Sequence, residues 1–386
     1  MLDQPLASLK RLRVEFQTKD GPVVGVEDVS FDVYPGETVC IVGESGSGKS
    51  VSSLSLMRLV EFGGGAIAGG QLLFDRGAEH GGVIDVANAG DDTMRTIRGN
   101  EIGMIFQEPM TSLNPVFTVG RQLTEGLRVH MGMTKEQATE RALELLHQVR
   151  IPEPERRLSQ YPHELSGGMR QRVVIAIALA CEPRLLIADE PTTALDVTIQ
   201  AEILALIDRL KRETGTAVMF ITHDMAVVAQ MADRVVVMYQ GNKVEEGPVE
   251  EIFENPQHDY TKSLLAAVPK LGEMRGKPAP EPMRLLGSET HETGPIVPKS
   301  DKVLLDVKNL CTQFPVMGGF FRRTVANVHA VEDVSFQVKS GETLSLVGES
   351  GCGKSSCGRS VLRLVEPLSG EVWLDGKNVM DCLLYT

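Results

Sequence analysis

The alternation of apolar and polar residues predicts an N-terminal block of strands. Val26 to Val33 alternates with a period of two, and Val14-Glu-Phe16 fits a partner strand across the turn residues Asp20-Gly21-Pro22. Thr38 to Val42 is instead apolar throughout, as in a strand that is buried on both faces of a sheet. We therefore expect a sheet that combines half-exposed and fully buried strands.

Helical periodicity appears in two places. Beyond Lys49, apolar residues recur at helical spacing as far as Val60, so a helix should follow the buried strand and the glycine-rich residues after it. Glu136 to Val149 predicts a second helix, within a helical insert from about residue 108 to 165. Its expected apolar face consists of Ala138, Ala142, Leu143, Leu146 and Val149.

Later apolar runs predict more buried strands and a hairpin. Leu185 to Ala188 and Ala217 to Ile221 are uninterrupted apolar runs of strand length. Arg234 to Tyr239 and Lys243 to Glu245 flank Gln240-Gly241-Asn242, which is typical of a hairpin turn.

An internal repeat divides the chain. Residues 25–50 and 330–355 are identical at 18 of 26 positions, and both stretches end in GxxxxGKS. The stretch Pro269 to Lys299 is rich in Pro, Gly, Glu and Lys and has few large apolar residues, which predicts a linker. The expected organisation is one complete domain over residues 1–270, a linker over 271–302, and a truncated copy of the domain's N-terminal part over 303–386.

Composition narrows the class of protein. The net charge of −13 argues against a broad basic surface for nucleic acid. Six cysteines without a CxxC pair favour reduced thiols, and because residues 182–310 contain none, no iron–sulfur cluster is expected. The longest apolar run, Val173 to Cys181, is about half a membrane span, and the N-terminus lacks the apolar core of a signal peptide. Any role at a membrane should therefore need membrane partners.

Two glycine-rich loops are candidate phosphate-binding sites. In the first, glycines allow backbone N–H groups to turn inward around phosphates at a helix N-terminus, Lys49 should reach the β- and γ-phosphates, and the Ser50 hydroxyl should bind Mg²⁺. The other positions of this loop are Gly43, Glu44, Ser45, Gly46, Ser47 and Gly48. The second loop supplies Gly348, Gly351, Gly353, Lys354 and Ser355.

Two acidic residues end the apolar run at 185–188. Asp189 fits the carboxylate that supports Mg²⁺ in P-loop enzymes, and Glu190 fits a general base toward attacking water. The alternative is an acidic strand end that faces solvent. Two acids directly after four apolar residues, in a chain with a P-loop, favour the catalytic interpretation.

The segment Leu165-Ser166-Gly167-Gly168-Met169-Arg170-Gln171-Arg172 precedes an apolar helix and resembles the signature motif of ATP-binding cassette (ABC) ATPases. Other segments resemble further motifs in the family's order: Phe106-Gln107-Glu108 the Q-loop, Ala194-Leu195-Asp196 the D-loop, and Ile221-Thr222-His223-Asp224 the switch histidine. The chain is thus identified as a member of this family over residues 9 to about 270. The resemblance implies an α/β fold of the P-loop NTPase type, with a mixed sheet core, an antiparallel β subdomain and a helical insert.

The resemblance also implies roles for particular residues. In this family two domains meet head to tail, so Ser166, Gly167 and Gly168 would face the γ-phosphate of ATP on the partner domain. Gln107 would sense Mg²⁺ and the attacking water, and His223 would hold the γ-phosphate. Phe16 is the candidate for stacking on adenine, and a core phenylalanine that faces the sheet is the alternative.

Two longer segments narrow the branch of the family. Residues 106–117 and 255–265 resemble bacterial oligopeptide, dipeptide and nickel import ATPases, although His258-Asp259-Tyr260-Thr261 departs at one position from the usual His-Pro-Tyr-Thr. Within this branch, the fusion of two such domains in one chain resembles the arrangement of glutathione import ATPases. The resemblance implies ATP-driven uptake of glutathione or short peptides, with two membrane permease subunits and a periplasmic binding protein, at the cytoplasmic face of the inner membrane.

The second copy lacks later motifs, so hydrolysis at Lys354 is not expected. A second ABC domain would then come from the same chain, from a homodimer or from a separate ATPase subunit. Two alternatives remain open: a soluble ABC ATPase that acts on ribosomes or DNA, and a non-catalytic remnant.

Overall fold

The computed structural model describes residues 4–107, 112–193, 195–268, 272, 300–318, 323–349 and 351–381. The chain divides into two compact units, the first over Met1–Leu195 and Ile199–Glu289 and the second over Asp196–Thr198 and Thr290–Thr386. Glu108, Ala194 and nearly all of the expected linker lie outside the described residues.

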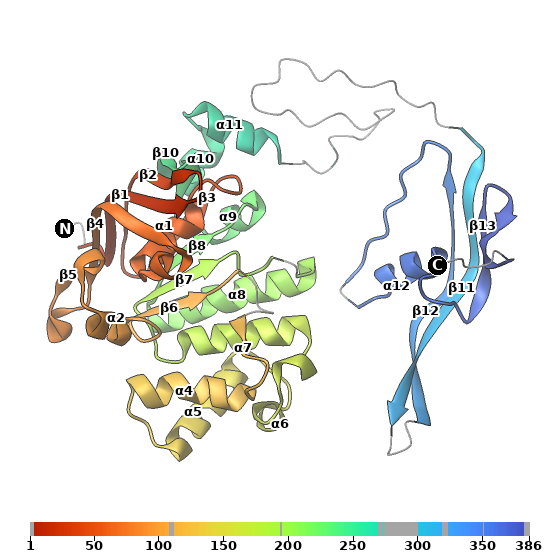
Figure 1. Cartoon of the computed structure of the whole chain (residues 1–386), viewed down its shortest axis with the longest axis horizontal. Coiled ribbons are helices and arrows are strands. Elements are labelled where there is room, and N and C mark those ends of the chain that lie inside the picture. The colour runs from red at the N-terminus through yellow and green to blue at the C-terminus, as the bar shows by residue number, and fades with distance from the viewer. Residues whose placement is uncertain are drawn as a thin grey trace. The chain divides into compact units, whose positions relative to one another are not determined.

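The first unit opens with antiparallel strands, β1 (Ala7–Thr18), β2 (Gly21–Val33), β4 (Gly65–Asp75) and β5 (Val83–Asp85), in the order β5-β4-β1-β2 (Figure 1). The first two are longer than the sequence pattern predicts. Ladder hydrogen bonds continue through polar residues as far as Thr18, which pairs with Gly21. The turn itself is at Lys19 and Asp20, so only Asp20 of the predicted turn residues lies in it, because Gly21 and Pro22 already pair with β1 as part of β2.

A parallel sheet forms the centre of the first unit. Its strands lie in the order β9-β3-β8-β7-β6, and β3, β8, β7 and β6 are buried along their whole length. The bounds are β3 Thr38–Val42, β6 Ile102–Ile105, β7 Leu185–Asp189, β8 Ala217–Ile221 and β9 Arg234–Tyr239. Strand β10 (Asn242–Pro248) pairs antiparallel with β9, as predicted, and joins the β1–β2 block through Asn242 and Asp28.

Helices cover this sheet and form the predicted insert. The insert contains α4 (Val119–His130), α5 (Lys135–Gln148) and α6 (Pro154–Leu158), which lie together in Figure 1. The other helices of the unit are α1 (Lys49–Leu56), α2 (Asp91–Ile97), α7 (Gly167–Leu179), α8 (Val197–Thr214), α9 (Met225–Met231), α10 (Val249–Glu254) and α11 (Asp259–Ala266).

Two helix predictions need correction. The helix after Lys49 does not continue to Val60, because Arg58 adopts a left-handed conformation with φ 50° and a short 3₁₀ turn follows. In α5, Leu145 is buried on the core face, whereas Leu143 is only partly buried. The start of α5 is fixed by a capping box between Thr134 and Gln137.

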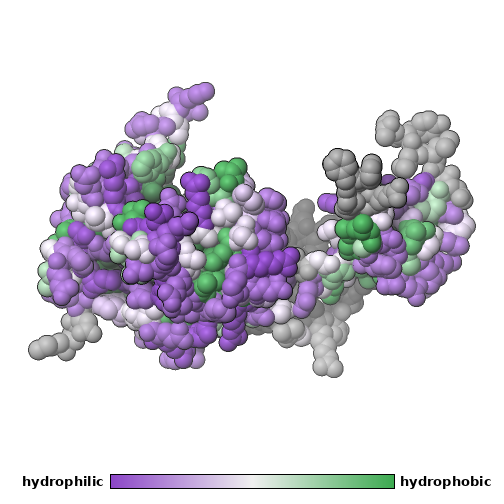
Figure 2. All heavy atoms as spheres, turned by 90° about the horizontal axis from the view of Figure 1, so that it is seen from below, coloured by the Kyte–Doolittle hydropathy of each residue, from purple (hydrophilic) through white to green (hydrophobic). Residues whose placement is uncertain are grey.

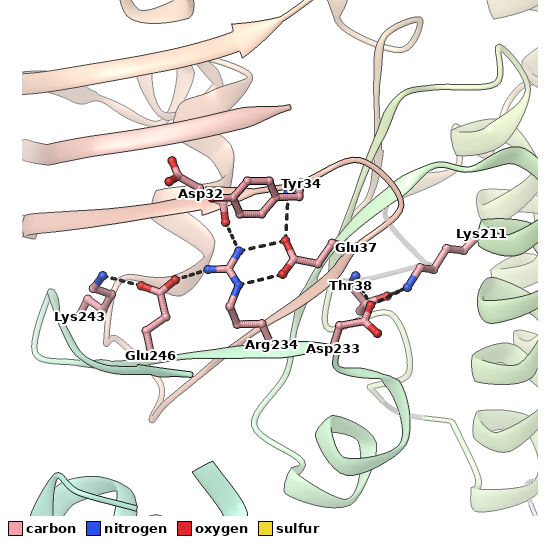
Figure 3. A network of polar contacts seen from close by, with 9 residues as sticks. All are labelled: Asp32, Tyr34, Glu37, Thr38, Lys211, Asp233, Arg234, Lys243 and Glu246. Atoms are coloured by element: carbon pink, nitrogen blue, oxygen red, sulfur yellow. Dashed lines mark hydrogen bonds and ion pairs between the residues drawn. The ribbon is translucent and has the colours of Figure 1, made fainter. Parts of the chain in front are cut away.

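A polar network ties the strands together at the end of the sheet where β3 and β9 begin (Figure 3). The Arg234 guanidinium donates to both carboxylate oxygens of Glu37, at 2.8 and 2.9 Å, and also pairs with Glu246. Beside it, the Asp233 carboxylate accepts from the Thr38 backbone N–H at 2.7 Å and from the Lys211 amine at 2.8 Å. These contacts join β3, β9, β10 and α8.

The second unit has its own antiparallel sheet in the order β12-β11-β13-β14. Its elements are β11 (Val303–Gly318), β12 (Arg323–Lys339), α12 (Lys354–Val361), β13 (Ser369–Leu374) and β14 (Lys377–Asn378). By analogy with β3 the repeat predicts a strand at 343–347, but these residues belong to no strand and Val347 is 87% exposed.

The face in Figure 2 is mostly hydrophilic, with hydrophobic side chains in separate patches. In the described part of the chain, no helix has both the length and the apolar character required to cross a bilayer.

The Arg234 network leads to a stability prediction. Arg234→Met leaves Glu37, which is largely buried, without its cation, whereas Glu246 keeps its pair with Lys243, and should lower the free energy of unfolding by about 3 kcal/mol. Urea denaturation of the full chain, followed by far-UV circular dichroism, measures the effect. Because the only tryptophan, Trp373, lies in the second unit, the transition seen by its fluorescence should not change.

Arg95→Met is the matched control, since the Arg95–Asp92 pair is highly exposed and should contribute less than about 1 kcal/mol. Equal destabilisation by the two variants would contradict a structural role for the network.

Candidate active site

The candidate residues lie at the carboxyl ends of four neighbouring parallel strands. The first glycine-rich loop, residues 43–50, follows β3; His223 follows β8; Asp189 and Glu190 end β7; and Gln107 follows β6. Carboxyl ends of parallel strands meet at one edge of a sheet, where α/β proteins bind their ligands. The structure thus brings together motifs that are far apart in the sequence.

The loop has a shape that requires glycine at two positions. Gly43 has φ 147°, and a Cβ there would lie 2.1 Å from the Met238 carbonyl oxygen. Gly48 has φ 95°, and a Cβ there would lie 2.7 Å from the Gly25 carbonyl oxygen. Both contacts are with backbone atoms that cannot move aside. Glu44, Ser45 and Gly46 form the exposed tip, whereas Ser47 is buried.

The Lys49 amine is held inside this loop. It donates to the Gly43 carbonyl at 2.8 Å and to the Glu44 carbonyl at 2.7 Å, and the residue is only 6% exposed. Burial lowers the pKa of Lys49, against the opposing attraction of Glu190, Asp189 and Glu44. A negatively charged group at the loop would relieve the cost of burying this cation.

Ser50 and Asp189 form a direct contact. The Ser50 hydroxyl donates to the Asp189 carboxylate at 3.0 Å, and Asp189 is 4% exposed. Burial raises the pKa of Asp189, and the nearby charge of Glu190 raises it further. The hydrogen bond from Ser50 and the charge of Lys49 act in the opposite direction. A hydroxyl beside a carboxylate is an oxygen donor set that suits Mg²⁺.

Three side chains hold the Glu190 carboxylate. One oxygen accepts from Gln107 Nε2 and from the Thr193 hydroxyl, each at 3.0 Å, and the other lies 3.0 Å from His223 Nδ1. Burial alone would raise the pKa of Glu190, but the hydrogen bonds from His223 and Thr193 outweigh it and the pKa is lowered. Glu190 also has a left-handed backbone, with φ 44°, which is a strained conformation typical of functional sites.

The predicted signature segment begins a helix. The Ser166 hydroxyl caps α7 by accepting from the Met169 N–H at 3.3 Å, and Ser166 and Gly167 are exposed. A Cβ at Gly168 would lie 3.2 Å from Ile199, whereas Gly167 faces open space. Within the described residues of the first unit, no hydrogen bond joins residues 166–168 to the loop at 43–50, so the structure does not bring these two motifs together.

A family model described as ABC transporter matches residues 26–193 and 331–384 of the chain. The chain belongs to the ABC transporter family. A second model, described as the C-terminal region of oligopeptide/dipeptide transporters, matches residues 244–288.

Curated relatives of the ABC family are identical to the chain at about half of the aligned positions. The glutathione import ATP-binding protein GsiA of Pectobacterium atrosepticum is 53% identical over 382 residues, which are 98% of this chain and 61% of that protein. GsiA of Escherichia coli K12 is 52% identical over 378 residues, covering 96% and 60%. The chain therefore spans about three fifths of the length of these relatives.

Solved structures show the same fold. The dimeric structure of the ATP-binding cassette MJ0796 in a post-hydrolysis state, bound to ADP and Pi, is 29% identical and has a TM-score of 0.54, over 63% of this chain and 98% of that one. The cbiO1 protein from Clostridium perfringens is 27% identical with a TM-score of 0.54, over 66% and 92%. The ABC ATPase fold that the sequence predicts is confirmed, and this fold implies nucleotide binding.

Phe16 packs against the sheet of this ABC fold. A Cβ at Gly25 or at Gly65 would each lie 2.8 Å from its ring, so the glycines on both neighbouring strands make room for it. The ring is partly buried against the hydrophobic core. This packing agrees with the alternative that Phe16 is a core phenylalanine facing the sheet. Stacking of Phe16 on adenine stays a prediction.

The second loop repeats the backbone of the first. Gly348, Gly351 and Gly353 have φ values of 151°, 84° and 97°, and the Lys354 amine donates to the carbonyls of Gly348 and Glu349 at 2.6 and 2.7 Å. Ser355 is exposed, and no side chain in the described part of the second unit bonds its hydroxyl as Asp189 bonds that of Ser50.

The sequence analysis assigned no site role to three residues near the site. Thr193 bonds Glu190, buried Gln171 donates to the Pro191 carbonyl, and the Tyr260 hydroxyl accepts from the Glu44 N–H at 2.8 Å. Gln171 and Tyr260 both lie in motifs that the sequence singled out for family resemblance alone. Thr193 lies three residues after Glu190, a spacing that gave no signal by itself.

The burial of Asp189 leads to a prediction about charge and stability. Since its pKa is raised in the folded state, the ionised form opposes folding at neutral pH, and this cost disappears as pH falls below the ordinary range of aspartate. Asp189→Asn should therefore keep or raise the melting temperature of the nucleotide-free protein at pH 7, yet lose the rise that MgATP causes.

Differential scanning fluorimetry measures both quantities. Asp92→Asn, at a side chain that is 99% exposed, should change neither. A large fall in the melting temperature of Asp189→Asn without nucleotide would contradict this account of the buried carboxylate.

Proposed function

We propose that this chain is the ATP-hydrolysing subunit of a bacterial importer. The observation that carries the proposal is the Glu190 carboxylate, held by Gln107, Thr193 and His223 at the strand edge that also presents Lys49 and Asp189. This set combines a phosphate-binding cation, a carboxylate suited to metal and a positioned base.

Each residue has a role that follows from its place. The amides of residues 43–50 and the Lys49 amine would bind the β- and γ-phosphates at the start of α1. Ser50 and Asp189, with Gln107, would hold Mg²⁺, which neutralises phosphate charge when bound. Glu190 would accept a proton from the attacking water, Gln107 would orient that water, and His223 would stabilise charge on the γ-phosphate.

A complete site should also need a second ABC domain. The signature residues Ser166 to Gly168 are exposed at a helix start and are not bonded to the loop of their own unit. We infer that they face the γ-phosphate on another domain, supplied by the same chain, by a second copy or by a separate ATPase subunit. The second loop is proposed to bind nucleotide as well.

The relatives support uptake of glutathione or short peptides as the purpose of hydrolysis. GsiA is named for glutathione import, and the model matching residues 244–288 is named for oligopeptide and dipeptide transporters. The proposed partners are two membrane permease subunits and a periplasmic binding protein, which would place this chain at the cytoplasmic face of the inner membrane. No direct contact with nucleic acid is proposed.

Two substitutions separate binding from turnover. Lys49→Ala should weaken MgATP binding at least about tenfold, because charged hydrogen bonds to phosphate are lost. Glu190→Gln should keep binding and lower turnover by about a hundredfold or more, because an amide cannot accept the proton of water.

Equilibrium binding of a fluorescent ATP analogue and phosphate release measure the two effects. Glu79→Gln, at an exposed site in the β4–β5 connection, should behave as wild type. Wild-type turnover in Glu190→Gln would remove the assignment of Glu190 as the base.

The helical insert is the proposed docking surface for the permease subunits. Val116, between β6 and α4, is 69% exposed, and a charge there should block docking without disturbing the core. Val116→Glu should abolish glutathione uptake by proteoliposomes that contain the permease subunits, while basal ATPase activity stays within about twofold of wild type.

Val83→Glu is the control, because Val83 is 54% exposed on β5, outside the insert. Normal uptake with Val116→Glu, or equal loss with Val83→Glu, would contradict docking at this part of the insert.

A further inference from the structure

Late elements of the first unit make hydrogen bonds to the backbone of the first glycine-rich loop, residues 43–50. The Tyr260 hydroxyl, on α11, accepts a hydrogen bond from the Glu44 N–H at 2.8 Å. The Gly241 N–H, in the β9–β10 turn, donates to the Ser47 carbonyl at 3.1 Å. Residues that come some 200 positions later in the chain therefore hold two peptide groups of the loop.

Tyr260 is fixed in this position by its surroundings. The residue is 2% exposed, and its ring lies against Tyr239 with a centroid distance of 4.3 Å. Burial raises the pKa of the Tyr260 phenol, so the hydroxyl stays neutral at physiological pH. The position of α11 is set by the Glu245 carboxylate, which accepts from the backbone N–H groups of Gln257 and His258 at 2.7 and 3.1 Å.

Glu44 links the Tyr260 hydroxyl to the amine of Lys49, the proposed phosphate-binding cation. The N–H of Glu44 is held by Tyr260, and the carbonyl of the same Glu44 accepts from the Lys49 amine at 2.7 Å. A shift of Glu44 would therefore move one of the two carbonyls that position the amine. Tyr260 itself touches neither the amine nor the strand-end carboxylates.

We propose that Tyr260 is a positioning residue, which holds Glu44 and thereby Lys49 in place and sets the affinity of the loop for nucleotide phosphates. The inference rests on the proposed function and adds α11, the last helix of the first unit, to the elements that determine nucleotide affinity.

Comparison with the second glycine-rich loop shows that losing the Tyr260 hydroxyl should change nucleotide affinity only modestly. It reaches nearly the same glycine φ values and the same two lysine–carbonyl bonds, and no tyrosine hydroxyl bonds Glu349 in the described part of the second unit. The loop's shape therefore does not need Tyr260, and the hydroxyl restrains a loop that already has this shape. Loss of one such hydrogen bond corresponds to an affinity change of about three- to tenfold.

The test compares two variants of the full chain that each lose one phenolic hydroxyl. Tyr260→Phe should raise the Kd for a fluorescent ATP analogue and the KM for MgATP about fivefold, while kcat stays within about twofold of wild type. Hydrogen exchange of the Glu44 amide should become faster. Tyr239→Phe keeps the ring that packs on Tyr260 and removes a hydroxyl that, among the described residues, accepts a hydrogen bond from exposed Gln240 alone, so it should leave Kd, KM and exchange unchanged.

Three results bear on the inference separately from the proposed function. Failure of the wild-type chain to bind the ATP analogue would overturn the proposed function itself. Tight binding by wild type together with equal Kd values for the two variants would overturn the role of Tyr260. A lower melting temperature in Tyr260→Phe with an unchanged Kd would also overturn it, because Tyr260 would then serve packing alone.

Discussion

The active-site edge depends on the parallel pairing of β3 with β8 on one side and β9 on the other. Both partner strands come from residues 217–239, so the loop that follows β3 is placed by segments far along the chain. A related segment, residues 343–347, lies in the second unit. In its described residues no strand flanks 343–347, and this segment forms no strand although it repeats much of the β3 pattern. Strand formation there is a property of the sheet rather than of the local sequence.

The two ends of the parallel strands differ in how well their charged side chains are paired. At the amino ends of β3 and β9, the charges of Arg234, Glu37 and Asp233 are matched by close partners. At the carboxyl ends, burial lowers the pKa of Lys49 and raises that of Asp189, and Glu190 has a strained backbone. The contacts at one end offset part of the cost of a site whose charges are arranged to meet a ligand.

The sequence predicted those features that a local pattern determines. The glycine loop before a helix, and the acids at the end of an apolar strand, each follow from a few neighbouring residues, and the structure has them where predicted. The break after α1 was missed because a left-handed Arg58 carries no compositional signal. The bond from Tyr260 to Glu44 joins residues 216 positions apart, and only the folded sheet and the docking of α11 bring them together. Long-range contacts of this kind cannot be read from one sequence.

If Glu190 is the base, as we propose, its present contacts must change before it accepts a proton. Its carboxylate already accepts from Gln107, Thr193 and His223, and these bonds lower its pKa and so weaken it as a base. A water that is to lose a proton to Glu190 must therefore compete with three protein groups. The His223 side chain is 63% exposed, so it has room to turn away from Glu190. Its movement toward a bound γ-phosphate would at once remove a donor from Glu190 and add one to the phosphate, so that the base gains strength only when the nucleotide is in place.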